Sequence, residues 1–213
     1  MPTNTFFRLP EEKRRRLIEA AEAEFTHTQF NEVSINKIIQ TAHIPRGSFY
    51  QYFADKEDLF RYLMEDMREY FFRILLEILN ENGDLITVPL RAFDRFLDAD
   101  GQADPVLARC IGIMQANPSM DISWLFHQEG DLLPDFVYPL LDVSRFRRSD
   151  RSFIDHTFFL LMVPLAHAIM ATLQQPAHRT EVRQTLADRV EIIHYGTYKI
   201  TQNKEDAPCT SKN

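Results

Sequence analysis

Residues 41–56, with the sequence TAHIPRGSFYQYFADK, constrain the fold more than any other stretch of this chain. A short helix is predicted before the turn, because apolar residues recur there at helical spacing. They are Ile35, Ile38, Ile39 and Ala42. Pro45 cannot continue this helix, since it lacks a backbone N–H. The pattern therefore predicts two short helices joined by a tight turn.

The second short helix has one apolar side and one polar side. Phe49 and Phe53 lie four residues apart, so we expect both to be buried on the same side. The other side chains have no apolar partner at helical spacing: Arg46, Ser48, Tyr50, Gln51 and Tyr52. We therefore expect them to face outward, unless the segment is only a short linker helix with half-buried tyrosines.

These outward side chains have the chemistry of a surface that binds DNA. Arg and Gln can make paired hydrogen bonds to guanine and adenine edges, and Ser, Tyr and the amides at a helix start can bind phosphates. Gly47 has no Cβ, so the helix backbone could approach a groove closely. The segment therefore indicates a DNA-reading helix-turn-helix.

Over roughly residues 10 to 65, the chain resembles the tetracycline-repressor (TetR) family of bacterial transcription regulators. The matching runs are Ala23-Glu24-Phe25, Gly47-Ser48-Phe49-Tyr50, Tyr52-Phe53 and Lys56-Glu57-Asp58-Leu59. Two positions depart from the family pattern. His43 stands where the turn usually has Gly, and Pro45 where the N-cap is usually Ser or Thr. His tolerates a positive φ better than most residues, and Pro pre-sets φ at a helix start, so both fit the motif.

The flanking sequence predicts where the neighbouring helices begin. Pro10, followed by two acidic residues, opens a helix. Ser34 is the expected N-cap of the first short helix, and Asp55 with Asp58 forms a capping-box-like start for the helix after the motif. The opening helix carries a core stripe of Leu17, Ile18, Ala21 and Phe25, and a basic run of Lys13, Arg14, Arg15 and Arg16. The basic run faces either phosphates or solvent.

The resemblance and the side-chain chemistry together assign DNA-binding roles. Arg46 and Gln51 are the expected contacts to base edges. Asn36 is expected to help from the preceding helix, and Gly47 to allow close approach. The expected phosphate contacts are Lys37, Ser48, Tyr50, Tyr52 and Lys56.

Charge is distributed unevenly along the chain. The formal net charge is -7, which does not suit a partner as acidic as DNA. Residues 1–56, however, hold eight Lys or Arg against seven Asp or Glu, whereas the rest of the chain holds 16 against 24. We therefore expect a locally basic surface on an acidic body, and a DNA affinity that falls steeply with salt.

Beyond Lys56 the pattern predicts an all-α fold. Helical periodicity, with Gly and Pro as breakers, predicts helices at about 56–80, 86–98, 104–116, 119–127, 133–144, 150–175 and 179–201. The predicted domains are a three-helix helix-turn-helix DNA-binding domain at 1–55, a larger helical ligand-binding and dimerisation domain at 56–202, and a disordered tail at 203–213.

The family resemblance implies a homodimer. In the family, the last two long helices of each subunit pair into a four-helix bundle. Two recognition helices about 34 to 36 Å apart can then read a palindromic operator in successive major grooves. The apolar or small residues at packing spacing on these helices are Phe153, Leu160, Leu161, Pro164, Ala168, Thr172, Val182, Leu186, Val190, Ile193 and Thr197.

The resemblance also implies a pocket for a small, lipophilic effector that releases a repressor from its operator. Taken singly, aromatic residues at helical spacing fill a core more often than they line a pocket. As a set, the candidates are Met67, Phe71, Arg109, Ile113, Met114, Trp124, Phe126, His127, Phe158 and Met162. Further polar groups that could orient a ligand are Asp155, His156 and His167.

The sequence argues against an enzyme. It contains no HExxH, CxxC, GxSxG or Gly-rich phosphate loop, and we expect no cofactor and no bound metal. The alternative to a ligand-responsive regulator is an all-helical adaptor that binds another protein without responding to a ligand. That alternative leaves the outward polar residues of the second short helix unexplained.

The expected location is the cytoplasm. Cys110 and Cys209 lie far apart and do not suggest a disulfide framework, and the first residues lack the cationic start and apolar run of an export signal. Residues 158–173 are almost wholly apolar, but Pro164 and His167 interrupt them. The run is also shorter than the roughly 20 residues of a membrane-spanning helix. We therefore expect a buried helix and no membrane partner.

Overall fold

The computed structural model describes residues 2–118 and 133–199, and the elements of this part of the chain are helical. The fold is all-α, as the sequence predicts. The helices are α1 (Asn4–Phe7), α2 (Glu11–His27), α3 (Ile35–Thr41), α4 (Arg46–Tyr52), α5 (Lys56–Asn82), α6 (Val88–Phe96), α7 (Pro105–Ala116), α8 (Arg151–Gln174) and α9 (Arg179–Thr197). The predicted helix at 119–127 and the predicted tail at 203–213 lie outside the described residues.

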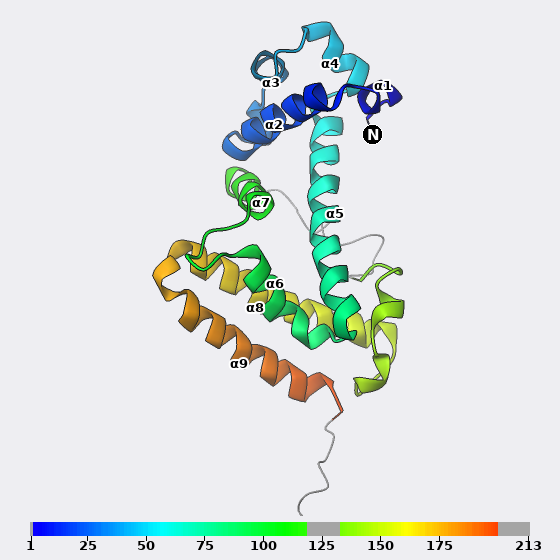
Figure 1. Ribbon diagram of the computed structural model, residues 1–213, viewed down its shortest axis with the longest axis vertical. Coiled ribbons are helices and arrows are strands. Elements are labelled where there is room, and N and C mark those ends of the chain that lie inside the picture. The colour runs from blue at the N-terminus through cyan, green and yellow to red at the C-terminus, as the bar shows by residue number, and fades with distance from the viewer. Residues whose placement is uncertain (1, 119–132, 200–213) are drawn as a thin grey trace, which may run out of the picture.

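The helices form two parts that α5 connects (Figure 1). At one end α1 to α4 surround the first turns of α5, whereas at the other end α6, α8 and α9 form a body around its last turns. Each part has its own hydrophobic cluster. The N-terminal cluster includes Phe6, Leu17, Phe25, Ile38, Phe49, Phe53 and Met67, and the body cluster includes Ile74, Leu79, Leu85, Phe93, Phe146, Ile154 and Leu161.

The connecting helix α5 begins and ends where the sequence predicts. At its start the Asp55 side chain accepts from the Asp58 amide at 2.7 Å, and the Asp58 carboxylate accepts from the Ala54 amide at 3.2 Å. At its end Gly83 adopts a left-handed φ of 62° and its amide donates to the Leu79 carbonyl at 2.7 Å. A glycine tolerates this conformation without strain, which makes it a good helix terminator.

The helix α7 packs against α2 and so joins the body to the N-terminal part (Figure 1). The close approach requires Gly112, because a Cβ at this position would lie 2.3 Å from the Thr26 side chain. Two polar contacts flank the crossing. The Phe30 amide donates to Asn117 Oδ1 at 2.7 Å, and Arg109 Nε lies 3.2 Å from Glu22 Oε1.

Two local expectations need correction. The sequence did not predict α1, which forms before the first expected helix and buries Phe6 completely. The expected helix at 133–144 is wrong, because over residues 133–146 the chain forms only short 3-10 turns at Tyr138–Leu140 and Val143–Arg145. Pro139 contributes to the difference, since a proline inside a helix removes a hydrogen bond and clashes with the preceding turn.

The apolar helix α8 belongs to the body of the fold. Its length and its mean hydropathy of 1.6 over an 18-residue window would also suit a membrane span. In this fold, however, it packs against α6 and α9, and 44% of that window is buried inside the protein. A helix that is apolar on most sides suits the core of a protein, and we interpret α8 as a core helix.

We predict that Gly112→Ala lowers the free energy of unfolding by about 1 to 3 kcal/mol, since an added Cβ overpacks the crossing of α2 and α7. Denaturant titration measures this change. The matched control is Gly47→Ala, because no atom lies within 4 Å of a Cβ built there. That control should gain stability, as Ala has the higher helix propensity. Equal losses for the two variants would contradict this role of Gly112.

Candidate nucleic-acid interface

The turn between α3 and α4 has the geometry that the sequence predicts. Ser34 caps α3 by accepting from the Lys37 amide at 3.4 Å, and His43 adopts a positive φ of 54°. The Ile44 amide then donates back to the Ile39 carbonyl at 2.9 Å, which closes the turn. Pro45, with a φ of -58°, precedes the first residue of α4. The two departures from the family pattern, His43 and Pro45, therefore preserve the turn.

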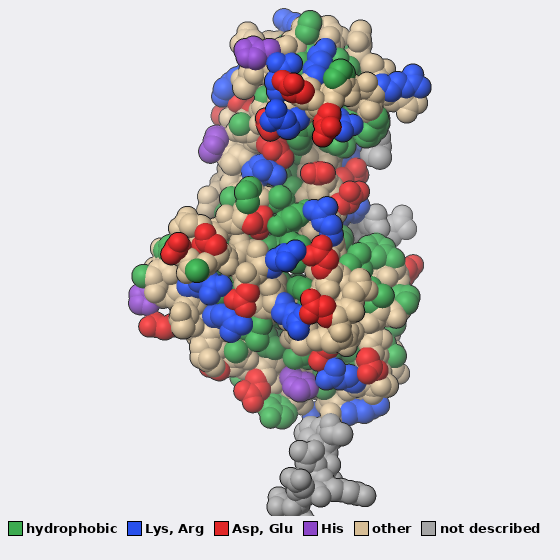
Figure 2. Space-filling model, viewed as in Figure 1, with side chains coloured by type: hydrophobic (Ala, Val, Ile, Leu, Met, Phe, Trp, Pro, Cys, Tyr) green, Lys and Arg blue, Asp and Glu red, His purple; other side chains and the backbone are tan. Residues whose placement is uncertain are grey.

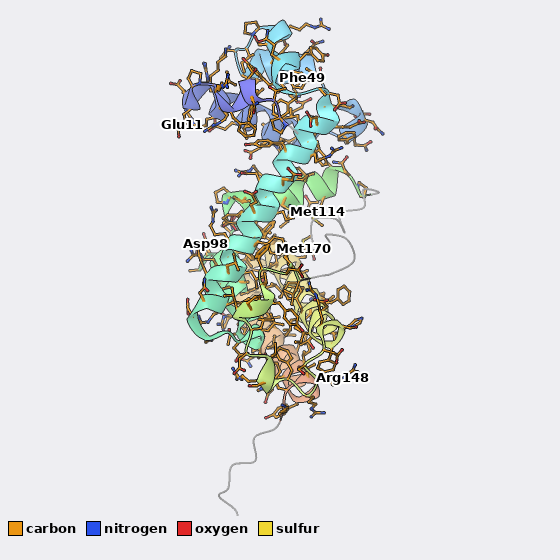
Figure 3. All side chains as sticks on the ribbon, turned by 90° about the vertical axis from the view of Figure 1, so that its right-hand side faces the viewer. Glu11, Phe49, Asp98, Met114, Arg148 and Met170 are labelled. Carbon is orange, nitrogen blue, oxygen red and sulfur yellow. The ribbon has the colours of Figure 1, made fainter. Side chains whose placement is uncertain are left out.

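One side of α4 is buried and the other is open. Phe49 and Phe53 are completely buried, as predicted, and Figure 3 shows Phe49 inside the N-terminal end of the molecule. The side chains of Arg46 and Gln51 are exposed, as is Tyr50 at 57% of its surface, whereas Ser48 is half-buried. On α3, Asn36 is exposed as well. All of these polar side chains except Ser48 are therefore open to a partner.

Gly47 lies in the first turn of α4 without a packing reason for being glycine. It is exposed, and a Cβ built on it would meet no atom within 4 Å. Glycine in a helix costs roughly 0.5 to 1 kcal/mol relative to alanine. Because the fold itself gains nothing from glycine at this position, a partner that approaches the backbone closely is the simplest physical reason for it.

Tyr52 differs from its prediction. The sequence places it among the outward side chains, but only 3% of its surface is exposed. The reason lies in α1, since the Phe6 ring lies 6.5 Å from the Tyr52 ring, measured between centroids. The sequence signal for this contact was the apolar pair Phe6-Phe7 just before the first predicted helix.

The two lysines predicted to bind phosphates both contact other residues of the protein. Lys56 Nζ donates to the carbonyls of Phe30 and Asn31 at 2.8 and 2.9 Å, and lies 5.0 Å from the centroid of the Phe30 ring. Lys37 Nζ lies 2.5 Å from Glu24 Oε2, although most of the Lys37 side chain is exposed. Lys56 thus closes the loop between α2 and α3 onto the start of α5.

The end of the molecule that carries α3 and α4 has mixed charge (Figure 2), as the near balance of basic and acidic residues in 1–56 suggests. At the top of Figure 2, which is the end formed by α1 to α4, Lys and Arg side chains are interspersed with Asp and Glu side chains. On α2, Arg15 pairs with Glu19 at 2.9 Å. Some of the basic run therefore neutralises acidic neighbours on the same helix, and only the remainder adds to the potential felt by a phosphate.

The described effector candidates are distributed over both hydrophobic clusters. Met67 and Ile113 are buried in the N-terminal cluster, Phe158 is buried in the body cluster, and Met162 packs against the body cluster. Phe71 packs against both clusters, and Met114, labelled in Figure 3, is 37% exposed. Trp124, Phe126 and His127 lie outside the described residues.

Polar groups expected to orient a ligand have other partners. Arg109 faces Glu22 of α2, where burial raises the pKa of the Glu22 carboxyl and the Arg109 charge opposes that rise. Asp155 is buried and accepts from the Leu133 amide at 3.3 Å. His156 and His167 are exposed on α8. Arg109 and Asp155 thus have structural contacts in the fold.

A cavity of about 150 Å³ lies between α8 and α9, and His167, one of the polar groups expected to orient a ligand, contributes to its lining. Its lining consists of His167, Ala168, Ala171, Val182, Thr185, Leu186 and Arg189. Within residues 2–118 and 133–199, no three His, Cys, Asp or Glu side chains are placed to share a metal ion.

Comparison with known proteins places the helix-turn-helix in a family. Residues 17–63 match the model of bacterial regulatory proteins of the tetR family. The uncharacterized HTH-type transcriptional regulator YdgC of Bacillus subtilis is 35% identical over 72 residues, which is 34% of this chain and 37% of that protein. The transcriptional regulator AcuR of Cereibacter sphaeroides is 32% identical over 82 residues, which is 38% of this chain and 37% of that protein. Each match spans little more than a third of the relative.

Two solved structures resemble the chain over most of its length. A transcriptional regulator from Cytophaga hutchinsonii covers 89% of this chain and 100% of its own, with 17% identity and a TM-score of 0.51. A TetR family transcriptional regulator from Chloroflexus aurantiacus covers 94% and 100%, with 23% identity and a TM-score of 0.47. At this level of identity, the first of these supports the fold alone.

We predict that Lys56→Met lowers the free energy of unfolding by about 1 to 3 kcal/mol, because it removes two hydrogen bonds from a charged donor. Denaturant titration measures the loss. The control is Arg15→Met, which removes an exposed ion pair and should cost less than about 1 kcal/mol. If Lys56→Met instead left stability unchanged and only weakened DNA binding, the phosphate role expected from the sequence would be correct.

Proposed function

The N-terminal domain of this chain belongs to the TetR family of bacterial regulatory proteins, and from this premise we propose that the protein is a ligand-responsive transcriptional regulator. In this proposal α4 enters the major groove of an operator, and α3 lies against the adjacent phosphates. The protein acts as a repressor in the cytoplasm and carries out no catalysis.

The open side of α4 is the observation that carries this proposal. Arg46 and Gln51 are exposed on a seven-residue helix whose opposite side is sealed by Phe49 and Phe53. Arg and Gln are the side chains best suited to paired hydrogen bonds with guanine and adenine edges. Gly47, directly after Arg46, allows the backbone to approach the groove. A protein-binding adaptor would need no such combination.

We further propose that α8 and α9 form the contact between two subunits. The residues that the sequence assigned to this contact are mostly wrong, since Leu161, Ala168, Thr172, Leu186, Val190 and Thr197 are buried within the subunit. Leu160, which the sequence also assigned to this contact, is exposed, and with it four other apolar side chains are open on these helices: Phe159, Val163, Ile192 and Tyr195, so that each of the five is 49 to 72% exposed. Burial of such a surface is the usual driving force for a stable dimer.

A dimer can also contact more base pairs than one short helix can. Four exposed positions on α4 can contact only a few base pairs, whereas two copies about 34 to 36 Å apart read two half-sites. The two-fold symmetry of a dimer would match a palindromic operator. We therefore propose that the protein binds such an operator as a homodimer.

For the effector we propose a small lipophilic molecule that binds the body beside α5 and α7. Phe71 packs against both hydrophobic clusters, and α7 contacts α2 through Gly112. A ligand that shifts α7 would therefore move α2 and change the separation of the two α4 helices. Only a difference in ligand affinity between the two arrangements can drive this change.

The test of the function is selection of bound sites from a random DNA pool at about 100 mM salt, where sequence-independent phosphate contacts still contribute strongly. We expect a palindromic site whose affinity falls as salt rises. Selection of no site by folded protein would favour the adaptor.

We predict that Arg46→Ala weakens binding to the selected site by about 1 to 3 kcal/mol and relaxes preference at one base pair. Fluorescence anisotropy with the selected site and with random DNA measures both effects. The control is Arg95→Ala, since Arg95 lies on α6, pairs with Glu77, and carries the same charge. Equal losses on selected and random DNA would contradict a base contact by Arg46.

We predict that Ile192→Glu converts the dimer into monomers, because it would bury an unpaired charge in the contact at the most exposed apolar side chain of α9, which is 72% exposed. Sedimentation velocity at micromolar concentration measures the change. The control is Phe136→Glu, which also places a charge at an exposed apolar residue. Phe136 is 56% exposed and does not belong to α8 or α9, so this variant should remain a dimer. A monomeric parent protein would overturn the proposed dimer directly.

A further inference from the structure

The segment before α2 holds the end of α4 in place. Thr3 makes two hydrogen bonds to α4, since its amide donates to the Tyr52 carbonyl at 2.9 Å and its hydroxyl donates to the Gln51 carbonyl at 2.6 Å. These carbonyls belong to the last turn of α4, where a helix has no internal donors for them. Residue 3 therefore supplies partners from a part of the chain 48 residues away.

Phe6 fixes the same end of α4 by packing. Its side chain is completely buried. Its ring centroid lies 4.9 Å from that of Phe53, 5.2 Å from that of Tyr62 on α5, and 6.5 Å from that of Tyr52. Aromatic pairs at these separations attract one another beyond the effect of burial alone. Phe6 thus fills the space between the end of α4 and the side of α5.

The helix α4 needs such support. It has seven residues, and its N-cap Pro45 makes no side-chain hydrogen bond. Isolated helices of this length are not stable in water. Its orientation must therefore come from contacts with the rest of the domain. The family match begins at residue 17, so it does not include the segment that makes these contacts.

We propose that residues 3–6 form a cap that positions α4 for sequence-specific binding, with Thr3 and Phe6 as the positioning residues. This inference rests on the proposed function of α4 in reading DNA. Loss of the cap leaves the side chains of Arg46 and Gln51 intact but releases the helix that carries them. Discrimination between operator and random DNA then falls, because base contacts need accurate placement whereas phosphate contacts tolerate movement.

The first test measures hydrogen exchange in the protein without DNA, comparing the peptides that cover α4 and α3. We expect Phe6→Ala to speed exchange in α4 by about tenfold while α3 changes much less, since local opening exposes only the helix that lost its support. The control is Phe7→Ala, which removes a neighbouring ring that is 51% exposed. Phe6→Leu should restore most of the protection.

The second test measures binding of the same variants to the selected site and to random DNA. Phe6→Ala should lower the affinity ratio between the two DNAs by about tenfold, with circular dichroism and the dimer unchanged, because specific contacts set this ratio. Thr3→Val removes the hydroxyl donor and should lower the ratio in the same direction by a smaller factor.

Two results would overturn the cap. If hydrogen exchange in α4 of the Phe6→Ala variant is the same as in the parent protein, the packing of Phe6 does not hold the helix. Equal acceleration in α3 and α4 would mean that Phe6 only stabilises the domain as a whole. If the parent protein selects no DNA site, the proposed function fails, and the exchange comparison still decides whether residues 3–6 hold α4.

Discussion

The structure depends on α5, a helix that is buried in two separate hydrophobic clusters. Its first turns, up to Met67, pack in the N-terminal cluster, and its later turns, from Ile74, pack in the body cluster. Phe71 lies between them and packs against both. A continuous helix transmits displacement along its axis with little loss, since each peptide is bonded to the next turn. One continuous helix therefore joins the domain that carries α3 and α4 to the body.

The contact between α7 and α2 provides a second connection between the two parts. It depends on the absence of a side chain at Gly112, which allows the helices to approach closely. The ion pair of Glu22 and Arg109 and the hydrogen bond from Phe30 to Asn117 fix the position of the crossing. Two connections constrain the N-terminal domain more than a single connection would, because a rotation of this domain about α5 would break the contact between α7 and α2. A change of shape in the body must therefore act on both.

The candidate DNA surface combines residues that the fold needs with residues that it leaves free. Phe49 and Phe53 stabilise α4, whereas Arg46, Gly47 and Gln51 remain open to a partner. Lys56 and Tyr52, expected on the same surface, contribute to the fold instead. A lysine near a phosphate surface can also satisfy carbonyls at a loop end, and residue type alone does not distinguish these roles.

The sequence by itself determined the helix-turn-helix, because its signals are local. Pro45 sets a φ, Asp55 and Gly83 cap α5, and the spacing of Phe49 and Phe53 defines a buried side. Only the tertiary structure decided which partners meet across long separations. Phe6 covers Tyr52, Arg109 faces Glu22, and most of the expected dimer residues of α8 and α9 turn inward, whereas Leu160 stays exposed. Helical periodicity shows that a helix has an apolar side, but not whether its own subunit or a second one covers that side.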